Sequence, residues 1–311
     1  MGRLHAVTGA LGYSGQQIAR SLLERGDRVR TLTNSPNRPN PFGDRVEICP
    51  LAFENRDALR SSLDGVDTFF NTYWVRFNHK LFTFAQAVEN TKRLFSAAKE
   101  AGVRRIVHVS ILKPEQGHGL AYYDGKLELE KALKGLNISH AILRPGVLFG
   151  RGDILVNNIA WTLRHLPVFG LFGDGNYKLQ PMHVDDFAAL ALECADREND
   201  FTADAVGPER FSYRELVTTI GRIIGVKRPI VSVPPALGYA VSKVINPFVG
   251  DVIITRQEIA GLMRGLLFSD GDRVGSKRLT EWTKQNREQL GRRYASEVGR
   301  RVKRNVAYEQ V

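Results

Sequence analysis

Thr8-Gly9-Ala10-Leu11-Gly12-Tyr13-Ser14-Gly15 is the stretch that decides the fold. An apolar run, residues 4–7, precedes it, and a pattern with apolar residues on one helical face follows it as far as Gly26. A strand, a glycine-rich turn and a helix in this order form the first half of a βαβ unit that binds dinucleotides. The stretch therefore predicts a nucleotide site near the start of the sequence.

The glycines of this loop have separate physical tasks. Gly9 allows the sharp turn, Gly12 lets the backbone approach a pyrophosphate, and Gly15 lets the helix pack closely on the strand. The N-terminus of the helix then faces the phosphates, because its N–H groups and its dipole favour negative charge. We expect five loop residues to contact the cofactor: Gly9, Gly12, Tyr13, Ser14 and Gly15.

The end of the predicted second strand, residues 29–33, indicates which dinucleotide binds. A site for NAD usually has an Asp or Glu here for the ribose hydroxyls. This chain instead continues Thr31-Leu32-Thr33-Asn34-Ser35, with Arg30 and Arg38 nearby and no acid before Asp44. Small polar groups and an arginine suit a 2′-phosphate. Thr33, Asn34 and Arg38 therefore predict NADP(H) in preference to NAD(H), which stays the alternative.

The composition is that of a globular α/β protein with unevenly placed positive charge. The chain has 311 residues, 43% hydrophobic and 25% charged, which suits one large domain or a main domain with a smaller one. Of the formal net charge of +11, residues 275–311 hold ten Lys or Arg against four Glu, a net of +6. This basic stretch is either a solvated helical surface or a surface for anionic lipid or a partner subunit, and nucleic acid is the weaker alternative.

No signal peptide and no membrane-spanning segment is recognisable in the sequence. The two cysteines, Cys49 and Cys194, lie far apart and lack the spacing of a metal site. Asp185 or Asp186 is expected to cap a helix near residues 187–194, with His183 packed at a strand end, so we expect no metal site. We predict a cytoplasmic protein that can lie at the inner face of a membrane.

An aromatic stretch, Asn71-Thr72-Tyr73-Trp74-Val75-Arg76-Phe77, follows the predicted fourth strand, residues 66–71. In folds of this kind the corresponding loop lines the crevice for the nicotinamide and the substrate. We expect Asn71 to contact the cofactor. Tyr73 and Trp74 either shape an apolar substrate pocket or pack the loop itself.

Ser110, Tyr122 and Lys126 are the predicted catalytic residues. Ser110 ends the predicted fifth strand, residues 105–110, and Tyr122-Tyr123-Asp124-Gly125-Lys126 opens the next helix. Tyr122 and Lys126 share one helical face. Hydride transfer to a carbonyl needs a proton donor, and a phenol serves only if an ammonium group lowers its pKa, while a serine hydroxyl orients the carbonyl. Lys126 would also bind the cofactor ribose, and Tyr123 is the rival tyrosine.

Four motifs occur in a fixed order: Thr-Gly-x-x-Gly-x-x-Gly, Tyr-x-x-x-Lys, Arg-Pro-x-x-x-x-Gly from Arg144, and Gly173-Asp174-Gly175 followed by His183-Val184-Asp185-Asp186. In this order they resemble extended and atypical short-chain dehydrogenase/reductases over roughly residues 3–233. Residues 71–74 and 179–186 are similar to the branch that includes the nucleotide-binding accessory subunit of respiratory complex I and its bacterial relatives. The resemblance implies a Rossmann-type doubly wound parallel sheet with a smaller C-terminal α/β lobe, and it places Pro145 and Gly146 near the nicotinamide.

The sequence departs from the extended branch at one informative position. Sugar-nucleotide epimerases and dehydratases of that branch carry an arginine that grips the substrate diphosphate, and the corresponding position here is Leu179. A neutral side chain cannot replace a bidentate phosphate ligand, although Lys178 lies next to it. A nucleotide sugar is therefore disfavoured as substrate. Lys178 and Asn157, on a predicted helix over residues 154–165, remain predicted pocket residues.

We expect residues 1–150 to form the nucleotide-binding core, 151–235 the cleft segments and small lobe interleaved with it, and 236–311 a helical basic extension. The predicted function is an NADP(H)-dependent oxidoreductase that transfers hydride to a carbonyl or polarised double bond of a small substrate. One alternative is a non-catalytic NAD(P)H-binding structural or sensor protein that joins a respiratory complex or membrane through residues 237–248 or the basic stretch. The other is a nucleotide-sugar epimerase or dehydratase.

Overall fold

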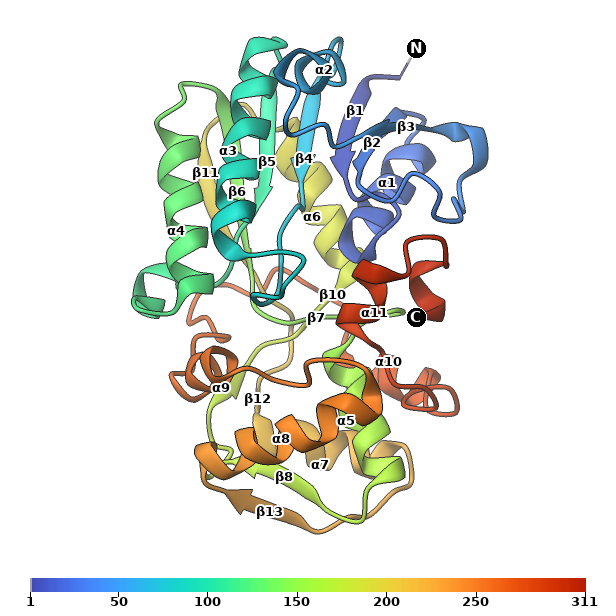
Figure 1. Ribbon diagram of the computed structural model, residues 1–311, viewed down its shortest axis with the longest axis vertical. Helices are drawn as coiled ribbons and strands as arrows, with labels where there is room; N and C mark the ends of the chain where they lie inside the picture. The colour runs from blue at the N-terminus through green and yellow to red at the C-terminus, as the bar shows by residue number, and fades with distance from the viewer. Residues whose placement is uncertain (1) are drawn as a thin grey trace. The chain divides into compact units, whose positions relative to one another are not determined.

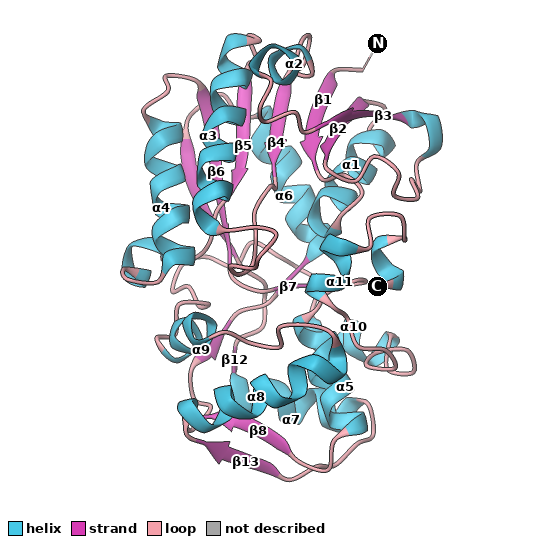
Figure 2. Cartoon of the chain, viewed as in Figure 1, coloured by secondary structure: helices cyan, strands magenta, loops and turns pink. Residues whose placement is uncertain are grey.

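The computed structural model describes residues 2–311, except for the side chain of Phe248. The chain forms two compact units, which are drawn in Figures 1 and 2. The first, which we call the sheet unit, contains the residues up to Pro145 together with Phe187–Ala205 and Asn305–Tyr308. The second unit contains Gly146–Asp186, Val206–Arg304 and Glu309–Val311.

The sheet unit is built on a seven-stranded parallel sheet in the order β11-β6-β5-β4-β1-β2-β3. The strand order reverses between β1 and β4, so the predicted doubly wound Rossmann-type sheet is confirmed. In chain order the strands are β1 (Leu4–Thr8), β2 (Arg28–Thr33), β3 (Val46–Pro50), β4 (Thr68–Asn71), β5 (Arg105–Val109), β6 (Ser139–Pro145) and β11 (Phe201–Ala205).

Helices cover both faces of this sheet because the right-handed crossovers run in opposite directions on the two sides of β1. In Figure 1, α3 and α4 lie in front of the strands and α6 lies behind them. α2, α3 and α4 pack on one another. The helices are α1 (Tyr13–Glu24), α2 (Arg56–Ser61), α3 (Phe84–Glu100), α4 (Ala121–Lys134) and α6 (Val184–Asp196), with short 3-10 turns at Gly43–Arg45 and Pro114–Gly117.

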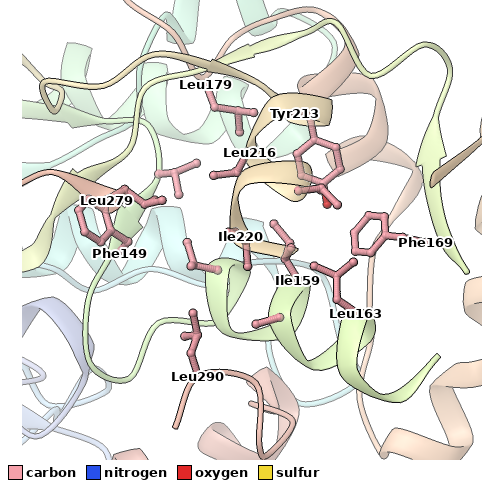
Figure 3. Close-up of a cluster of buried hydrophobic side chains, with 14 of the residues drawn as sticks. Phe149, Ile159, Leu163, Phe169, Leu179, Tyr213, Leu216, Ile220, Leu279 and Leu290 are labelled. Carbon is pink, nitrogen blue, oxygen red and sulfur yellow. The ribbon is translucent and has the colours of Figure 1, made fainter. Parts of the chain in front are cut away.

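The second unit is organised around two amphipathic helices, α5 (Leu155–His165) and α7 (Tyr213–Ile223). Figure 3 shows their apolar faces meeting, with Ile159 and Leu163 of α5 directed at Ile220 of α7. Three two-stranded sheets complete it: β7 (Leu148–Phe149) with β10 (Met182–His183), β9 (Lys178–Leu179) with β12 (Phe211–Ser212), and β8 (Phe169–Phe172) with β13 (Ile230–Val233). This is the smaller α/β region that the sequence predicts.

The C-terminal residues join this core instead of standing apart as an extension. After α8 (Pro235–Val249) and α9 (Arg256–Met263), Leu279 of α10 (Leu279–Gln285) and Leu290 are buried in the cluster of Figure 3. The last elements are α11 (Glu297–Val302) and a 3-10 turn, η3 (Tyr308–Gln310). Leu279 and Leu290 therefore anchor the basic stretch in the apolar core of the second unit, which its net charge does not reveal.

The start of α7 has a capping box, whereas the start of α6 differs from the one that the sequence predicts. Ser212 and Glu215 form a reciprocal capping box at the start of α7. α6 already begins at Val184, so Asp185 and Asp186 lie in its first turn. Their carboxylates bind the 276–277 segment instead, since Asp186 accepts the N–H groups of Ser276 and Lys277, each at 2.7 Å. The expectation that either aspartate caps the helix was wrong.

One fully buried cation ties β5 to the loop before β11. The guanidinium of Arg105 donates to the carbonyl oxygens of Cys194 and Asn199, each at 2.8 Å, and its carbon lies 5.8 Å from the centroid of the Phe201 ring. Burial lowers the pKa of Arg105. The Cys194 carbonyl is buried, so its hydrogen bond with Arg105 offsets the cost of removing it from water.

Arg105→Met is expected to lower the free energy of unfolding by about 2–4 kcal/mol, because it leaves buried carbonyl oxygens unpaired. Arg56→Met is the matched control, since the exposed pair of Arg56 with Glu100 contributes at most about 1 kcal/mol. Urea unfolding of both variants measures the difference. Equal midpoints would show that the Arg105 contacts add no net stability.

Candidate functional site

The glycine-rich loop has a backbone geometry that side chains cannot share. Gly9 has φ +69°, and its N–H donates to the Leu32 carbonyl at 3.0 Å. A Cβ on Gly15 would lie 2.4 Å from the carbonyl oxygen of Gly9. Gly12 directly precedes α1, so Tyr13 and Ser14 open the helix in its first turn. First-turn N–H groups lack partners within a helix, which makes this end an anion site that fits a pyrophosphate.

A buried polar network joins the carboxyl ends of β1, β4 and β5. Thr72 donates its N–H to Thr8 Oγ1 at 2.7 Å and its hydroxyl to the Thr8 carbonyl at 2.6 Å. Asn71 lies within hydrogen-bond distance of Thr8 Oγ1 at 3.2 Å and of His108 Nδ1 at 3.1 Å. These strand ends flank the switch point of the sheet, where ligands bind in such folds. The Asn71 side chain thus holds the edge of the crevice, and its contact with a cofactor stays a prediction.

His108 was missed by the sequence analysis. It is fully buried, and burial lowers its pKa well below the usual value, so the ring is neutral. A polar residue inside the apolar run of β5 was the available signal. Its ring also meets Phe95 edge to face, with centroids 5.1 Å apart.

The residues after β2 divide between two tasks. Thr33 Oγ1 accepts the N–H of Ser35 at 3.0 Å and so shapes the turn that carries Asn34. Arg38 is only 6% exposed, and its guanidinium carbon lies 5.6 Å from the centroid of the Tyr308 ring. Arg30, by contrast, pairs with Glu47 at 2.8 Å and donates to backbone carbonyls before β4. Of the two arginines, Arg38 is therefore the one that lies beside Tyr308, and its contact with a 2′-phosphate stays a prediction.

Ser110 is held by a charged network. Its hydroxyl donates to Glu130 Oε1 at 2.6 Å, and the same oxygen accepts Arg144 Nε at 2.9 Å. Arg144 also bonds Glu115 at 2.6 Å. Because the Ser110 hydroxyl donates its hydrogen bond to the Glu130 carboxylate, it does not at the same time donate to a substrate carbonyl. Glu130 escaped sequence reasoning, although it lies one helical turn beyond Lys126 on the same face of α4.

Lys126 of α4 is buried, and its ammonium lies at the end of β5. Its ammonium donates to the Val109 carbonyl at 2.7 Å and lies 4.5 Å from the centroid of the Trp74 ring. Burial lowers the pKa of Lys126 to about 7. The group therefore changes charge in the physiological range, which is the property that a proton-handling site requires.

Tyr122 shares Trp74 with Lys126. The Tyr122 ring meets Trp74 edge to face with centroids 5.6 Å apart, and it meets Phe84 in the same way at 5.8 Å. We call Tyr122, Trp74, Phe84 and Lys126 the aromatic–lysine cluster. Tyr123, the rival of Tyr122 for the catalytic role, is buried against Gly117. A Cβ on Gly117 would lie 2.3 Å from the Tyr123 ring. The structure thus brings the predicted tyrosine and lysine together around Trp74.

The Tyr73 side chain contacts residues outside the aromatic–lysine cluster. Its hydroxyl accepts a hydrogen bond from Asn90 Nδ2 at 3.1 Å, and its ring packs on Phe53 with centroids 5.2 Å apart. Of the two readings in the sequence analysis, loop packing describes Tyr73 better than a substrate pocket. Pro145 ends β6, and its carbonyl accepts the N–H of Leu112 at 3.0 Å, while Gly146 follows it into the second unit.

Asn157 has a structural task within the second unit. Its Oδ1 accepts the N–H of Gly291 at 3.1 Å, and its Nδ2 donates to the Arg293 carbonyl at 2.9 Å. Both ends of the amide are therefore engaged by the C-terminal backbone, and its place in a substrate pocket stays a prediction. Lys178 lies with its ammonium 5.2 Å from the centroid of Phe268, and Leu179 is fully buried in the cluster of Figure 3.

Two further findings concern the described residues, 2–311. This range contains no group of three or more His, Cys, Asp or Glu side chains that could bind a metal ion. Within the same range, no helix is long and apolar enough to cross a membrane.

Comparison with known proteins finds NAD(P)H-binding relatives. A family model described as NAD(P)H-binding matches residues 9–157. Subunit 9 of the mitochondrial NADH dehydrogenase 1 alpha subcomplex of Arabidopsis thaliana is 25% identical over 288 residues, 86% of this chain and 72% of that protein. The (4-alkanoyl-5-oxo-2,5-dihydrofuran-3-yl)methyl phosphate reductase of Streptomyces griseus is 29% identical over 229 residues, 72% of this chain and 74% of that protein.

Solved structures share the fold at lower identity. Triphenylmethane reductase of Citrobacter sp. superimposes with a TM-score of 0.75 at 18% identity, over 92% of this chain and 99% of that one. An NADPH-dependent quinone oxidoreductase of Escherichia coli, complexed with NADPH, gives 0.73 at 20% identity, over 90% and 99%. The doubly wound sheet, the glycine loop and the motif order agree with these likenesses: residues 9–157 match the NAD(P)H-binding family model, and the chain is similar to atypical short-chain dehydrogenase/reductases.

Proposed function

We propose that the protein is an NADPH-dependent oxidoreductase that reduces a carbonyl or polarised double bond of a small substrate. The observation that carries this proposal is the aromatic–lysine cluster, which joins a tyrosine and a buried lysine whose pKa is about 7 at the carboxyl ends of β4 and β5. Hydride transfer is the chemistry that the bound nicotinamide supplies. The reductases among the relatives and structural neighbours support the same reaction class.

The chain's own groups divide the work as follows. Gly9, Gly12 and Gly15 let the backbone bind the pyrophosphate at the N-terminus of α1, and Arg38 with Thr33 and Asn34 binds the 2′-phosphate. Lys126 binds the ribose hydroxyls and stabilises negative charge on the Tyr122 oxygen. Tyr122 gives its phenolic proton to the reduced substrate. Ser110 donates to Glu130 and so helps to hold the side chains of the site in place. It does not polarise the substrate carbonyl.

The substrate class follows from the aromatic side chains of this cluster. Trp74 stacks on Phe84, and Tyr122 meets both rings edge to face. Aromatic side chains of this kind bind a planar acceptor by stacking. The substrates for which two structural neighbours are named, a quinone and a triphenylmethane dye, are aromatic or planar electron acceptors. We therefore propose a quinone-like or aromatic carbonyl acceptor over a nucleotide sugar, and the buried Leu179 supports that exclusion.

Tyr122→Phe is expected to leave NADPH affinity unchanged and to lower turnover by about 10²–10⁴-fold, the usual contribution of a positioned proton donor. NADPH oxidation with a panel of quinones and aromatic carbonyls measures it. Tyr123→Phe is the matched control and should keep turnover. Full activity in Tyr122→Phe, or loss in the control alone, would refute the role given to Tyr122.

The pH profile tests Lys126. Since its pKa is lowered to about 7, the ammonium form is lost as pH rises through neutrality, and kcat/KM is expected to fall above about pH 7. Bound NADPH is anionic and raises the pKa of a nearby ammonium, so the same limb in kcat should lie at higher pH. Lys126→Met should remove this limb from both profiles. An unchanged limb in that variant assigns the ionisation to another group.

A second candidate is a non-catalytic NADPH-binding protein that associates with a membrane or a respiratory complex. Ser110, whose hydroxyl donates a hydrogen bond to Glu130, favours it, and so does α8. Leu237, Val241 and Val244 of α8 are 54%, 48% and 67% exposed, and residues 235–249 contain no acid. An exposed apolar helix face without acidic residues suits an anionic lipid surface. Phe248, which the sequence analysis included in this face, lies outside the described side chains.

Vesicle flotation separates the two candidates. The second predicts that NADPH stays reduced across the whole acceptor panel and that the protein floats with vesicles containing anionic lipid, whereas Val244→Glu stays in solution. Lys243→Gln should weaken flotation less than Val244→Glu, because burial of apolar surface dominates binding. Turnover without flotation would leave the oxidoreductase as the sole function.

A further inference from the structure

Tyr308, near the C-terminus, contacts two residues that the sequence predicts to bind the cofactor, Tyr13 and Arg38. Tyr308 opens the 3-10 turn η3, and the segment Asn305–Tyr308 belongs to the sheet unit. The Tyr308 ring is nearly parallel to the ring of Tyr13, with centroids 6.5 Å apart and 12° between the planes. The guanidinium carbon of Arg38 lies 5.6 Å from the Tyr308 centroid. We call Tyr13, Arg38 and Tyr308 the C-terminal clasp.

The clasp joins three segments that are far apart in the sequence. Tyr13 is the first residue of α1 after Gly12, so it lies directly beside the phosphate-binding turn. Arg38 comes from the loop between β2 and β3. This loop, residues 34–43, contains no acidic residue. Tyr308 therefore adds a neutral aromatic surface, and no negative charge, to the place where a 2′-phosphate would bind.

Aromatic contact leaves the phosphate-binding groups of an arginine available. A guanidinium stacks through its planar face, while its N–H donors point outward in that plane and bind a phosphate bidentately. An isolated arginine has many rotamers and must give up this freedom when it binds an anion. Arg38 is only 6% exposed, so its side chain is already ordered among its neighbours. Preorganisation of this kind increases affinity for the group that the N–H donors bind.

We propose that Tyr308 is a positioning residue for cofactor selection: it holds Arg38 and Tyr13 in the conformation that binds the 2′-phosphate of NADPH. The C-terminal segment thereby contributes to the preference for NADPH over NADH. This inference rests on the proposed function only in taking the loop of residues 9–15 and Arg38 as the NADP(H) site.

Dissociation constants of NADPH and NADH, measured by calorimetry on the full chain, test the inference without any substrate. Tyr308→Ala is expected to weaken NADPH binding about tenfold, the scale of a desolvated cation–aromatic contact, and to change NADH binding less than about threefold. Tyr308→Phe keeps the ring and should restore NADPH affinity.

Phe201→Ala is the matched control. Phe201 also lies under a guanidinium, with Arg197 4.8 Å from its centroid, but it starts β11 at the amino end of the parallel sheet, away from the glycine loop. Its removal should leave the ratio of the two dissociation constants unchanged. Thermal unfolding of each variant verifies that it is folded at the temperature of the titration.

Four outcomes contradict the inference. Unchanged NADPH affinity in Tyr308→Ala would show that the ring does not position Arg38, and an equal loss for NADPH and NADH would show a general structural role. Tighter NADPH binding would show that the ring competes with the adenine. A wild-type chain that binds neither nucleotide would overturn the proposed function together with this inference, whereas the first three results overturn the inference alone.

Discussion

The contact between Gly15 and the carbonyl oxygen of Gly9 is the constraint on which the nucleotide-binding half depends. A side chain at Gly15 would come within 2.4 Å of that oxygen, so α1 reaches its position over β1 only because the residue is glycine. The positive φ of Gly9 turns the chain sharply at the end of β1. Together they direct the N-terminus of α1 at the carboxyl edge of the sheet, and the position of every other predicted cofactor residue is defined relative to that edge.

The carboxyl edge itself is held by polar groups that are buried and mutually bonded. Thr8, Asn71, Thr72 and His108 connect three neighbouring strands, and on the next element Ser110, Glu130 and Arg144 form a charged network. Buried polar groups without partners are costly, so such networks fix one arrangement of side chains. The second network also engages the Ser110 hydroxyl, which donates to Glu130.

The C-terminal part of the chain illustrates how net charge can mislead about structure. Residues 275–311 carry a net charge of +6, which is typical of a solvated surface or a binding tail. Leu279 and Leu290 nevertheless complete an apolar core, and Asn157 holds the backbone near residues 291–293. The charged side chains can remain at the surface because the apolar residues of the same segments are buried. The clasp at Tyr308 is a second case in which the sequence does not reveal a structural role. The role of this aromatic residue follows only from its contacts with Tyr13 and Arg38.

The sequence by itself determined the order of strands and helices, the glycine turn and the pairing of Tyr122 with Lys126, because these depend on neighbours within one or two helical turns. It also excluded a diphosphate-gripping arginine at Leu179. Only the tertiary structure decided that Ser110 bonds Glu130, that Asn157 and Tyr73 contact residues of distant segments, and that Tyr308 contacts both Arg38 and Tyr13. Each of these depends on a partner more than a dozen residues away, and the direction of a side chain toward such a partner is set by packing, not by local spacing.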